Sequence, residues 1–141
     1  LARERRRRIT LNAEPAVVLG DIDQLGILLR NLLDNAVRYA GEGGTIAVSC
    51  GPESRDGAPA VVLRVADDGP GVPPADRERI FDRFFRAHGN GNGARGSGIG
   101  LSLVARAARS HGARIEVGDG IDGRGLSVTV RFVPMADRTE G

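Results

Sequence analysis

The sequence predicts an α+β domain, because segments with strand-like alternation and segments with helical periodicity occur in one short chain. The chain has 141 residues, of which 40% are hydrophobic, and a domain of this size buries a core without disulfides or metals. Apolar residues recur at helical spacing in some segments and alternate in others. The predicted order is two strands, a helix, two strands, a short helix, a loop, a helix and two strands.

The first elements are two short strands and a long helix. Residues 9–11 and 16–19 are apolar runs on either side of a proline, and we expect two small strands that pair. Asp21 is a favourable N-cap residue, and leucines and other apolar residues follow it at helical spacing. The helix is expected to end at Gly41, the first of three closely spaced glycines.

The middle of the chain predicts a hairpin, a loop and a short helix. Residues 45–50 and 60–66 are the two strands, and their polar connection, 51–59, is expected to form a loose tip. The Gly- and Pro-rich segment 67–74 must be a loop, and a short helix is expected at 75–80.

The last third predicts a loop, a helix and a second hairpin. Residues 88–100 include six glycines without periodicity, so we expect a mobile loop. Helical spacing from residue 99 ends near Gly112, a natural left-handed cap. Residues 113–117 and 125–133 alternate as two strands around a turn.

Charge divides the chain unevenly. The 20 basic and 18 acidic residues give a net charge of +2, and five arginines against one glutamate give residues 1–8 a charge of +4. We expect residues 1–8 to be a basic arm from a preceding linker, 9–135 one domain and 136–141 a C-terminal tail. A solvated arm is the simplest interpretation, and no nucleic-acid partner is expected for the acidic remainder.

Cysteine usage and hydropathy favour a reducing, cytoplasmic location. Cys50 is the only cysteine, which excludes an internal disulfide. No apolar run approaches the ~18 residues that span a bilayer. Because the sequence starts with Leu1 instead of Met, we expect a piece of a longer protein.

Polar residues on the first long helix indicate a metal site. Asn31, Asn35 and Arg38 follow one another at spacings of four and three, so they share one stripe, predicted to lie opposite the leucines. Asparagine is a mediocre helix former. Its amide oxygen is a ligand that Mg²⁺ accepts when phosphates complete the shell.

Two glycine-containing segments indicate a nucleotide. Asp67 closes a predicted strand, and its carboxylate suits the amino group of adenine, while Gly69 and Gly71 let a flat base approach the backbone. The glycines of segment 96–101 precede a helix, where backbone amides and the helix dipole favour a polyphosphate. A Walker loop is disfavoured because its Lys and spacing are absent, and a Rossmann unit is excluded because no βαβ pattern precedes these glycines.

Four segments together resemble the boxes of bacterial sensor histidine kinases. Residues 31–40 (NLLDNAVRYA) resemble the N box, 67–72 (DDGPGV) the G1 box, 80–86 (IFDRFFR) the F box and 96–104 (GSGIGLSLV) the G2 box. The resemblance implies the ATP-binding fold that these kinases share with gyrase, Hsp90 and MutL. That fold is a two-layer sandwich, in which three helices cover one face of a mixed, mostly antiparallel sheet.

The resemblance also implies a role for each matching residue. Asn35 would coordinate Mg²⁺ with Asn31 close to the metal and phosphates, and Asp34 would lie beside the metal ligand. Arg38 would reach the phosphates and Tyr39 would line the base or ribose. The remaining residues implied to hold ATP are Asp67, Gly69, Gly71, Arg83, Arg86, Gly96, Gly98, Gly100 and Leu101.

The implied activity is transfer of the ATP γ-phosphoryl group to a histidine on a separate dimerisation domain, and then to a response regulator receiver domain. The parent is expected to be dimeric and membrane-bound, and the piece monomeric. Neither His88 nor His111 lies in an acceptor-like helix. Two alternatives remain: an ATPase of the same superfamily, which would carry Glu at the place of Asn31, or a non-enzymatic module that binds through the arginines of the arm.

Overall fold

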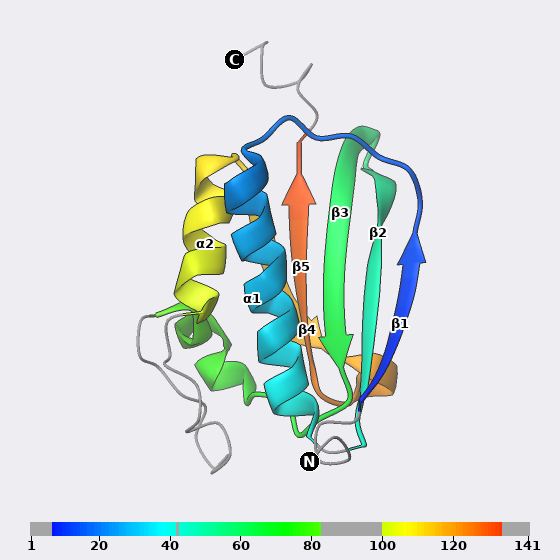
Figure 1. Cartoon of the computed structure of the whole chain (residues 1–141), viewed down its shortest axis with the longest axis vertical. Helices are drawn as coiled ribbons and strands as arrows, with labels where there is room; N and C mark the ends of the chain where they lie inside the picture. The colour runs from blue at the N-terminus through cyan, green and yellow to red at the C-terminus, as the bar shows by residue number, and fades with distance from the viewer. Residues whose placement is uncertain (1–6, 42, 83–99, 134–141) are drawn as a thin grey trace.

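The computed structural model describes residues 7–41, 43–82 and 100–133 and has two layers (Figure 1). Within these residues a five-stranded sheet has the order β1-β2-β3-β5-β4. Helices α1 and α2 lie side by side on one face of the sheet (Figure 1). The strands are β1 (Arg8–Ala13), β2 (Thr45–Arg55), β3 (Ala58–Asp67), β4 (Arg114–Asp119) and β5 (Leu126–Phe132). The helices are α1 (Ile22–Ala40), α2 (Gly100–Ser110) and the 3₁₀ segments η2 (Pro74–Phe81) and η4 (Ile121–Gly123).

The predicted α+β sandwich with a mixed sheet is confirmed. Strand β1 pairs with β2 in parallel, and the other neighbours pair antiparallel. Helix α1 begins as predicted, because the Asp21 side chain accepts a hydrogen bond from the Gln24 backbone N–H at 3.0 Å. Leu28 and Leu32 of α1 are buried in one hydrophobic cluster with sheet residues such as Val65. This cluster fixes α1 over the middle of the sheet.

The predicted strand at 16–19 is wrong. Residues 14–21 have no strand, and Val17 is 87% exposed. The partner of β1 is β2, with Leu11 opposite Val48. Because β1 is at the sheet edge, the segment that follows it crosses the ends of the strands to reach α1 (Figure 1). Apolar residues in this segment therefore serve a crossing connection and not a ladder.

The predicted loose tip between β2 and β3 is also wrong. Both strands continue to a tight turn, in which Arg55 pairs with Ala58. The two central residues, Asp56 and Gly57, have φ of 53° and 79°. An Asp-Gly pair with two positive φ angles is the turn whose twist suits an antiparallel hairpin. Beyond Cys50, β2 has no β1 partner and is an edge strand, so polar residues and a proline are tolerated there. These residues lack the apolar alternation from which a strand is predicted.

The remaining elements follow the prediction with one change of type. The short helix is the 3₁₀ segment η2, and its first residue, Pro74, suits a helix start. Helix α2 ends as predicted, and Gly112 follows it with φ of 65°. No described helix is both long and apolar enough to cross a bilayer. Residues 1–6 and 136–141 of the predicted arm and tail lie outside the described residues.

Candidate functional site

Asp67 is a buried carboxylate at the end of β3. Period-two alternation puts it on the same face as Val65, which belongs to the core, and Asp67 is only 2% exposed. Its Oδ1 atom accepts hydrogen bonds from the backbone N–H groups of Gly69 at 2.8 Å and Leu126 at 3.4 Å. Within the described residues Oδ2 has no hydrogen-bond partner. Burial raises the pKa of the Asp67 carboxyl, and the two backbone hydrogen bonds oppose that rise.

The loop after Asp67 is packed so closely that its glycines are required. A Cβ atom at Gly69 would lie 2.0 Å from the Tyr39 carbonyl oxygen. A Cβ at Gly71, whose φ is 80°, would lie 2.9 Å from the Gly125 carbonyl oxygen. These two glycines bring the loop against α1 on one side and against the start of β5 on the other. The structure thus gives both glycines a packing role, and their predicted role of making room for a base stays a prediction.

The next residue, Asp68, faces away from this loop's packing. Its Oδ1 accepts the backbone N–H of Thr45 at 3.0 Å, and its own N–H donates to the Thr45 carbonyl at 3.2 Å. The Asp68 carboxylate therefore binds the start of β2 and takes no part in the packing of the loop around Asp67.

Three residues of α1 connect this loop to the start of α2. Asn31, Asn35 and Tyr39 are four residues apart, so they follow one another along one side of the helix at about 6 Å intervals. The predicted surface position of Asn35, opposite the leucines, is wrong: it is 8% exposed and lies among the buried residues of the helix. Within the described residues its side chain forms no hydrogen bond. Although the residue is mostly buried, its unbonded amide atoms keep some contact with solvent, which leaves the amide oxygen accessible to a metal ion.

Asn31 marks the other end of the stripe. Its Nδ2 group donates to the Ile27 carbonyl at 2.8 Å, which leaves Oδ1 available. A Cβ at Gly100 would lie 3.0 Å from that Oδ1 atom, so the first residue of α2 lies against Asn31. The side chain of Leu101 is buried in the core, which leaves only its backbone for a ligand.

The other predicted residues divide into three groups. Arg38 and Tyr39 are half-buried at the end of α1, and Tyr39 packs against the core. Asp34 is exposed. Residues that lie outside the described part of the chain are Arg83, Arg86, Gly96, Gly98 and the predicted mobile loop, including His88.

His111 is unsuited to accept a phosphoryl group. It is 6% exposed, and both ring nitrogens are engaged. Nε2 accepts the backbone N–H of Asp21 at 3.0 Å, and Nδ1 lies 2.7 Å from the Ala107 carbonyl. Because a backbone N–H only donates, the ring is neutral with its proton on Nδ1. The predicted exclusion of His111 as acceptor agrees with this geometry.

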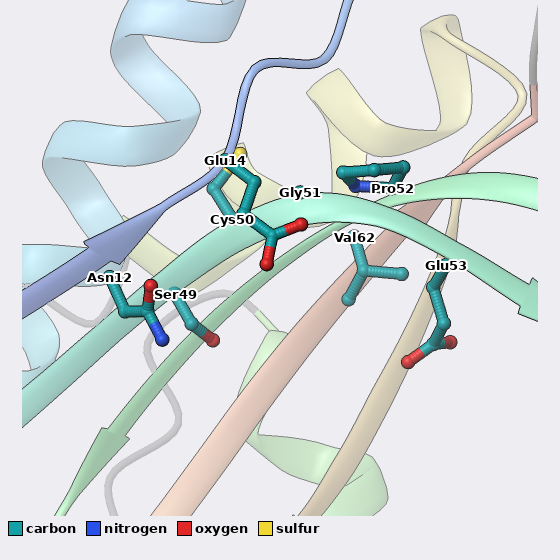
Figure 2. Close-up of a pocket in the computed structure, with 8 residues that line it drawn as sticks. All are labelled: Asn12, Glu14, Ser49, Cys50, Gly51, Pro52, Glu53 and Val62. Carbon is teal, nitrogen blue, oxygen red and sulfur yellow. The ribbon is translucent and has the colours of Figure 1, made fainter.

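A hollow of about 170 Å³ on β1 and β2 has the wrong chemistry for a polyphosphate. Figure 2 shows that Glu14 and Glu53 line it, together with Asn12 and Ser49. The Glu14 carboxylate repels an anion, and the Glu53 carboxylate is already ion-paired with Arg131. Cys50, also on this hollow, is half-buried and unpaired. Among the described residues no cluster of His, Cys, Asp and Glu side chains could hold a metal ion.

The sequence interpretation missed two glycines that pack on Asp67. A Cβ at Gly120 would lie 2.0 Å from the Asp67 carbonyl oxygen, and one at Gly125 would lie 2.2 Å from it. The signal was present, because residues 118–125 include four glycines. The local pattern around these glycines predicts only a turn between two strands.

These features coincide with a known family. A family model described as "Histidine kinase-, DNA gyrase B-, and HSP90-like ATPase" matches residues 20–137. The chain belongs to this family. The match includes α1, the loop after β3 and α2, which carry every described residue of the candidate site.

The relatives are sensor histidine kinases. The sensor protein QseC of Escherichia coli K12 is 41% identical over 82% of this chain and 24% of its own length. The solved structure of a mycobacterial sensor histidine kinase, MprB, has a TM-score of 0.78 and 30% identity over 92% of this chain and 86% of that chain. Full-length ShkA in complex with AMPPNP has a TM-score of 0.71 and 30% identity over 92% of this chain and 26% of that chain. The domain is therefore an ATP-binding catalytic domain of the sensor histidine kinase type, and it spans about a quarter of the length of such curated relatives.

Proposed function

We propose that this domain binds Mg²⁺-ATP and donates the γ-phosphoryl group to a histidine on a separate dimerisation domain, for relay to an aspartate of a response regulator receiver domain. The observation that carries the proposal is the line of polar groups along α1 from Gly100 to Asp67, inside a family of ATP-binding domains. A cytoplasmic location and a dimeric, membrane-bound parent are part of the same proposal.

Base recognition is assigned to Asp67. An ionised carboxylate only accepts hydrogen bonds, and the unused Oδ2 atom suits the exocyclic amino group of adenine. Gly69 and Gly71 keep side chains away from the base, and Tyr39 would line the base or ribose. The AMPPNP bound to ShkA supports an adenine nucleotide as the ligand of this domain type.

Metal binding is assigned to Asn35, in the middle of the stripe, and phosphate binding to its Asn31 end. The amide of Asn35 would supply an oxygen to Mg²⁺, which neutralises phosphate charge when bound. Asn31 lies beside Gly100, where the backbone of α2 starts and where Gly96, Gly98, Gly100 and Leu101 would surround the phosphates. Arg38, Arg83 and Arg86 would add positive charge.

The proposed reaction needs positioning more than it needs a base. The bond between the γ-phosphorus and the bridging oxygen breaks, ADP leaves with that oxygen and the bonding electron pair, and a bond to an imidazole nitrogen of the acceptor forms. The acceptor nitrogen carries its own lone pair, so no residue of this chain has to deprotonate it. The amides, glycines and arginines of the site hold and neutralise the polyphosphate while the acceptor approaches.

Labelled ATP tests this function directly. The chain is mixed with γ-labelled ATP, Mg²⁺ and a separately supplied dimerisation domain from the same parent. We expect label on the acceptor domain and little free phosphate, and an acceptor with its histidine replaced should stay unlabelled. Rapid phosphate release with no label on the acceptor would contradict the proposed kinase activity and indicate an ATPase. Binding of nucleic acid through the arm, independent of ATP and lost at high salt, would favour a non-enzymatic module.

A further inference from the structure

The turn between β4 and β5 closes around Asp67. The β3–β5 ladder ends at the pair Ala66 and Ser127, and the next donor, the Leu126 N–H, reaches the Asp67 side chain instead. A Cβ at Gly125 would lie 2.5 Å from Asp67 Oδ1, so only glycine allows this approach. The turn is itself closed by a hydrogen bond from the Gly120 N–H to the Gly125 carbonyl at 3.1 Å.

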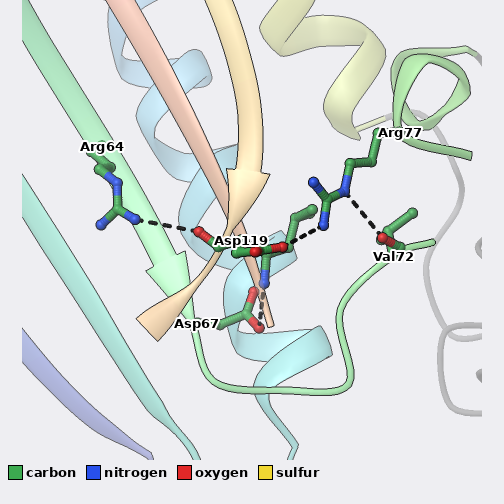
Figure 3. Close-up of polar contacts among 6 residues, drawn as sticks. Arg64, Asp67, Val72, Arg77 and Asp119 are labelled. Atoms are coloured by element: carbon green, nitrogen blue, oxygen red, sulfur yellow. Dashed lines mark hydrogen bonds and ion pairs between the residues drawn. The ribbon is translucent and has the colours of Figure 1, made fainter. Parts of the chain in front are cut away.

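Arg77 joins this turn to the loop that follows Asp67. Its Nε group donates to the Val72 carbonyl at 3.1 Å, and its guanidinium forms an ion pair with Asp119 Oδ1 at 2.7 Å. Figure 3 shows Arg77 between Val72 and Asp119, with Arg64 approaching Asp119 from the other side. Arg64 donates to the Asp119 carbonyl at 3.4 Å, which ties the end of β4 to β3.

The two flanks of Asp67 are thus connected to each other. Val72 is at the end of the loop that supplies the Gly69 hydrogen bond, and Asp119 is at the start of the turn that supplies the Leu126 hydrogen bond. Both hydrogen bonds go to Oδ1. Holding the two donors at a fixed separation therefore orients the carboxylate and leaves Oδ2 as the atom for a ligand.

We propose that Arg77 and Asp119 are positioning residues for base recognition, whose ion pair holds the loop after β3 against the β4–β5 turn and so orients Asp67. This inference rests on the proposed function of Asp67 as the adenine acceptor. Arg77 is not assigned a contact with ATP. It acts through Val72 and Asp119 on the carboxylate.

The size of the expected effect follows from exposure. The side chains of Arg77 and Asp119 are 22% and 65% exposed, and a pair this exposed contributes little to global stability. Its loss should instead loosen the carboxylate and weaken the single hydrogen bond to the base amino group. We expect the preference for ATP over inosine triphosphate to fall about twofold to fivefold, the range for an exposed ion pair.

Inosine triphosphate is the appropriate probe because it carries a keto oxygen where ATP carries the amino group and shares the ribose and phosphates. Affinities for both nucleotides with Mg²⁺ are measured by calorimetry on Arg77→Met, Asp119→Ala and the double variant. Arg124→Met is the matched control, because Arg124 is exposed and lines the same cleft of about 490 Å³ as Arg77 and Asp119. The Asp67→Ala variant tests whether Asp67 recognises the base, which is the proposed function on which this inference rests.

The proposal expects Arg77→Met and Asp119→Ala to lower the ATP preference by similar factors, with no further loss in the double variant and none in Arg124→Met. The affinity for inosine triphosphate should be the same as in the unsubstituted chain. An unchanged preference in Arg77→Met, with a lowered one in Asp67→Ala, overturns the positioning role and keeps the function. An equal loss of both nucleotides overturns it in favour of a purely structural role. An unchanged preference in Asp67→Ala overturns base recognition and the positioning role together.

Discussion

The ring of His111, at the end of α2, accepts the backbone N–H of Asp21, which caps the start of α1. The two residues are 90 positions apart, and this 3.0 Å bond joins opposite ends of the two helices that carry the candidate site. The ring also fills the space beside Gly20, where a Cβ would lie 2.7 Å from it. His111 therefore joins the end of α2 to the start of α1, in addition to the core that the two helices share.

His111→Phe should lower the free energy of unfolding by about 1–3 kcal/mol, because the ring volume is kept while the Asp21 N–H loses its buried partner. Urea unfolding followed by circular dichroism measures it. Ser110→Ala is the control: it removes an exposed hydrogen bond within the same helix, to the Arg106 carbonyl, and should change stability by less than about 0.5 kcal/mol. Equal effects of the two variants would contradict the role of His111.

Gly69 and Gly26 form a second matched pair. Gly69→Ala should destabilise the chain by more than about 1 kcal/mol, because its Cβ would lie 2.0 Å from the Tyr39 carbonyl oxygen and the backbone must move. Gly26 is inside α1, and a methyl group there would meet no neighbouring atom within 4 Å, so Gly26→Ala should stabilise by about 0.5–1 kcal/mol. Thermal unfolding of both variants shows whether each substitution raises or lowers the stability of the chain. A neutral Gly69→Ala would mean that the loop is not packed on α1.

Local patterns predicted most of the fold, and distant contacts account for what they missed. The capping of α1 by Asp21 and the end of α2 at Gly112 are encoded within a few residues, so the sequence predicts them. The parallel pairing of β1 with β2 joins segments about 37 residues apart, Arg8 with Thr45, and no local pattern specifies it. Residues 16–19 have strand composition, but no partner strand lies beside them.

The candidate site shows the same limit. Helical spacing puts Asn31 and Asn35 on one stripe. The burial of Asn35, however, depends on the elements that pack against α1 in the folded chain. The role of Gly125 beside Asp67 depends on a turn 58 positions later in the chain, as the hydrogen bond between Asp67 and the adjoining Leu126 shows at a separation of 59. Chemical type was readable from the sequence, whereas the partners that orient each group required the fold.

Asn35→Ala should remove the Mg²⁺ dependence of ATP binding, because the Asn35 amide is the group assigned to the metal. The expected loss in the presence of Mg²⁺ is at least about tenfold, the effect found for residues that support a metal site. A fluorescent ATP analogue is titrated with Mg²⁺ and again with a chelator. Because Asn35 is buried, thermal unfolding without nucleotide must first show that the variant is folded at the assay temperature. Unchanged affinity with Mg²⁺ would remove Asn35 from the site.

The raised pKa of Asp67 predicts a defined pH dependence of stability. Burial raises this pKa above 3.8, so across the interval from 3.8 to the native value the folded state binds more protons than the unfolded state. Stability contributed by the protonated carboxyl is therefore present below 3.8 and is lost as pH rises through the native pKa. The unfolding free energy of the unsubstituted chain minus that of Asp67→Asn should fall as pH rises through this interval. Urea unfolding between pH 4 and 7 measures it, and a difference that rises with pH would contradict the assignment.

ATP should change that titration in a known direction. The base amino group donates to the ionised carboxylate, so bound ATP favours ionisation and lowers the pKa of Asp67. ATP affinity should accordingly increase as pH rises through the native pKa, after the phosphate titration is subtracted with inosine triphosphate. The same slope for both nucleotides would separate Asp67 from the base.

Asn31 should determine whether the site hydrolyses ATP. An amide is too weak a base to take a proton from water, so the chain should hold ATP with very slow turnover. A Cβ atom at Gly100 would lie 3.0 Å from Asn31 Oδ1. Asn31 is therefore beside the proposed phosphate site at the start of α2. Asn31→Glu places a carboxylate there, and we expect phosphate release to rise about tenfold or more, since a positioned general base contributes about 10²–10⁴-fold. Asn31→Gln is the matched control, because it has the length of Glu without its basicity and should stay slow. Asp34→Asn, measured in parallel, tests whether the adjacent exposed carboxylate supplies any residual turnover. If Asn31→Glu and Asn31→Gln release phosphate at the same rate, Asn31 does not face the γ-phosphate, and the position of the phosphates along α1 has to be reassigned.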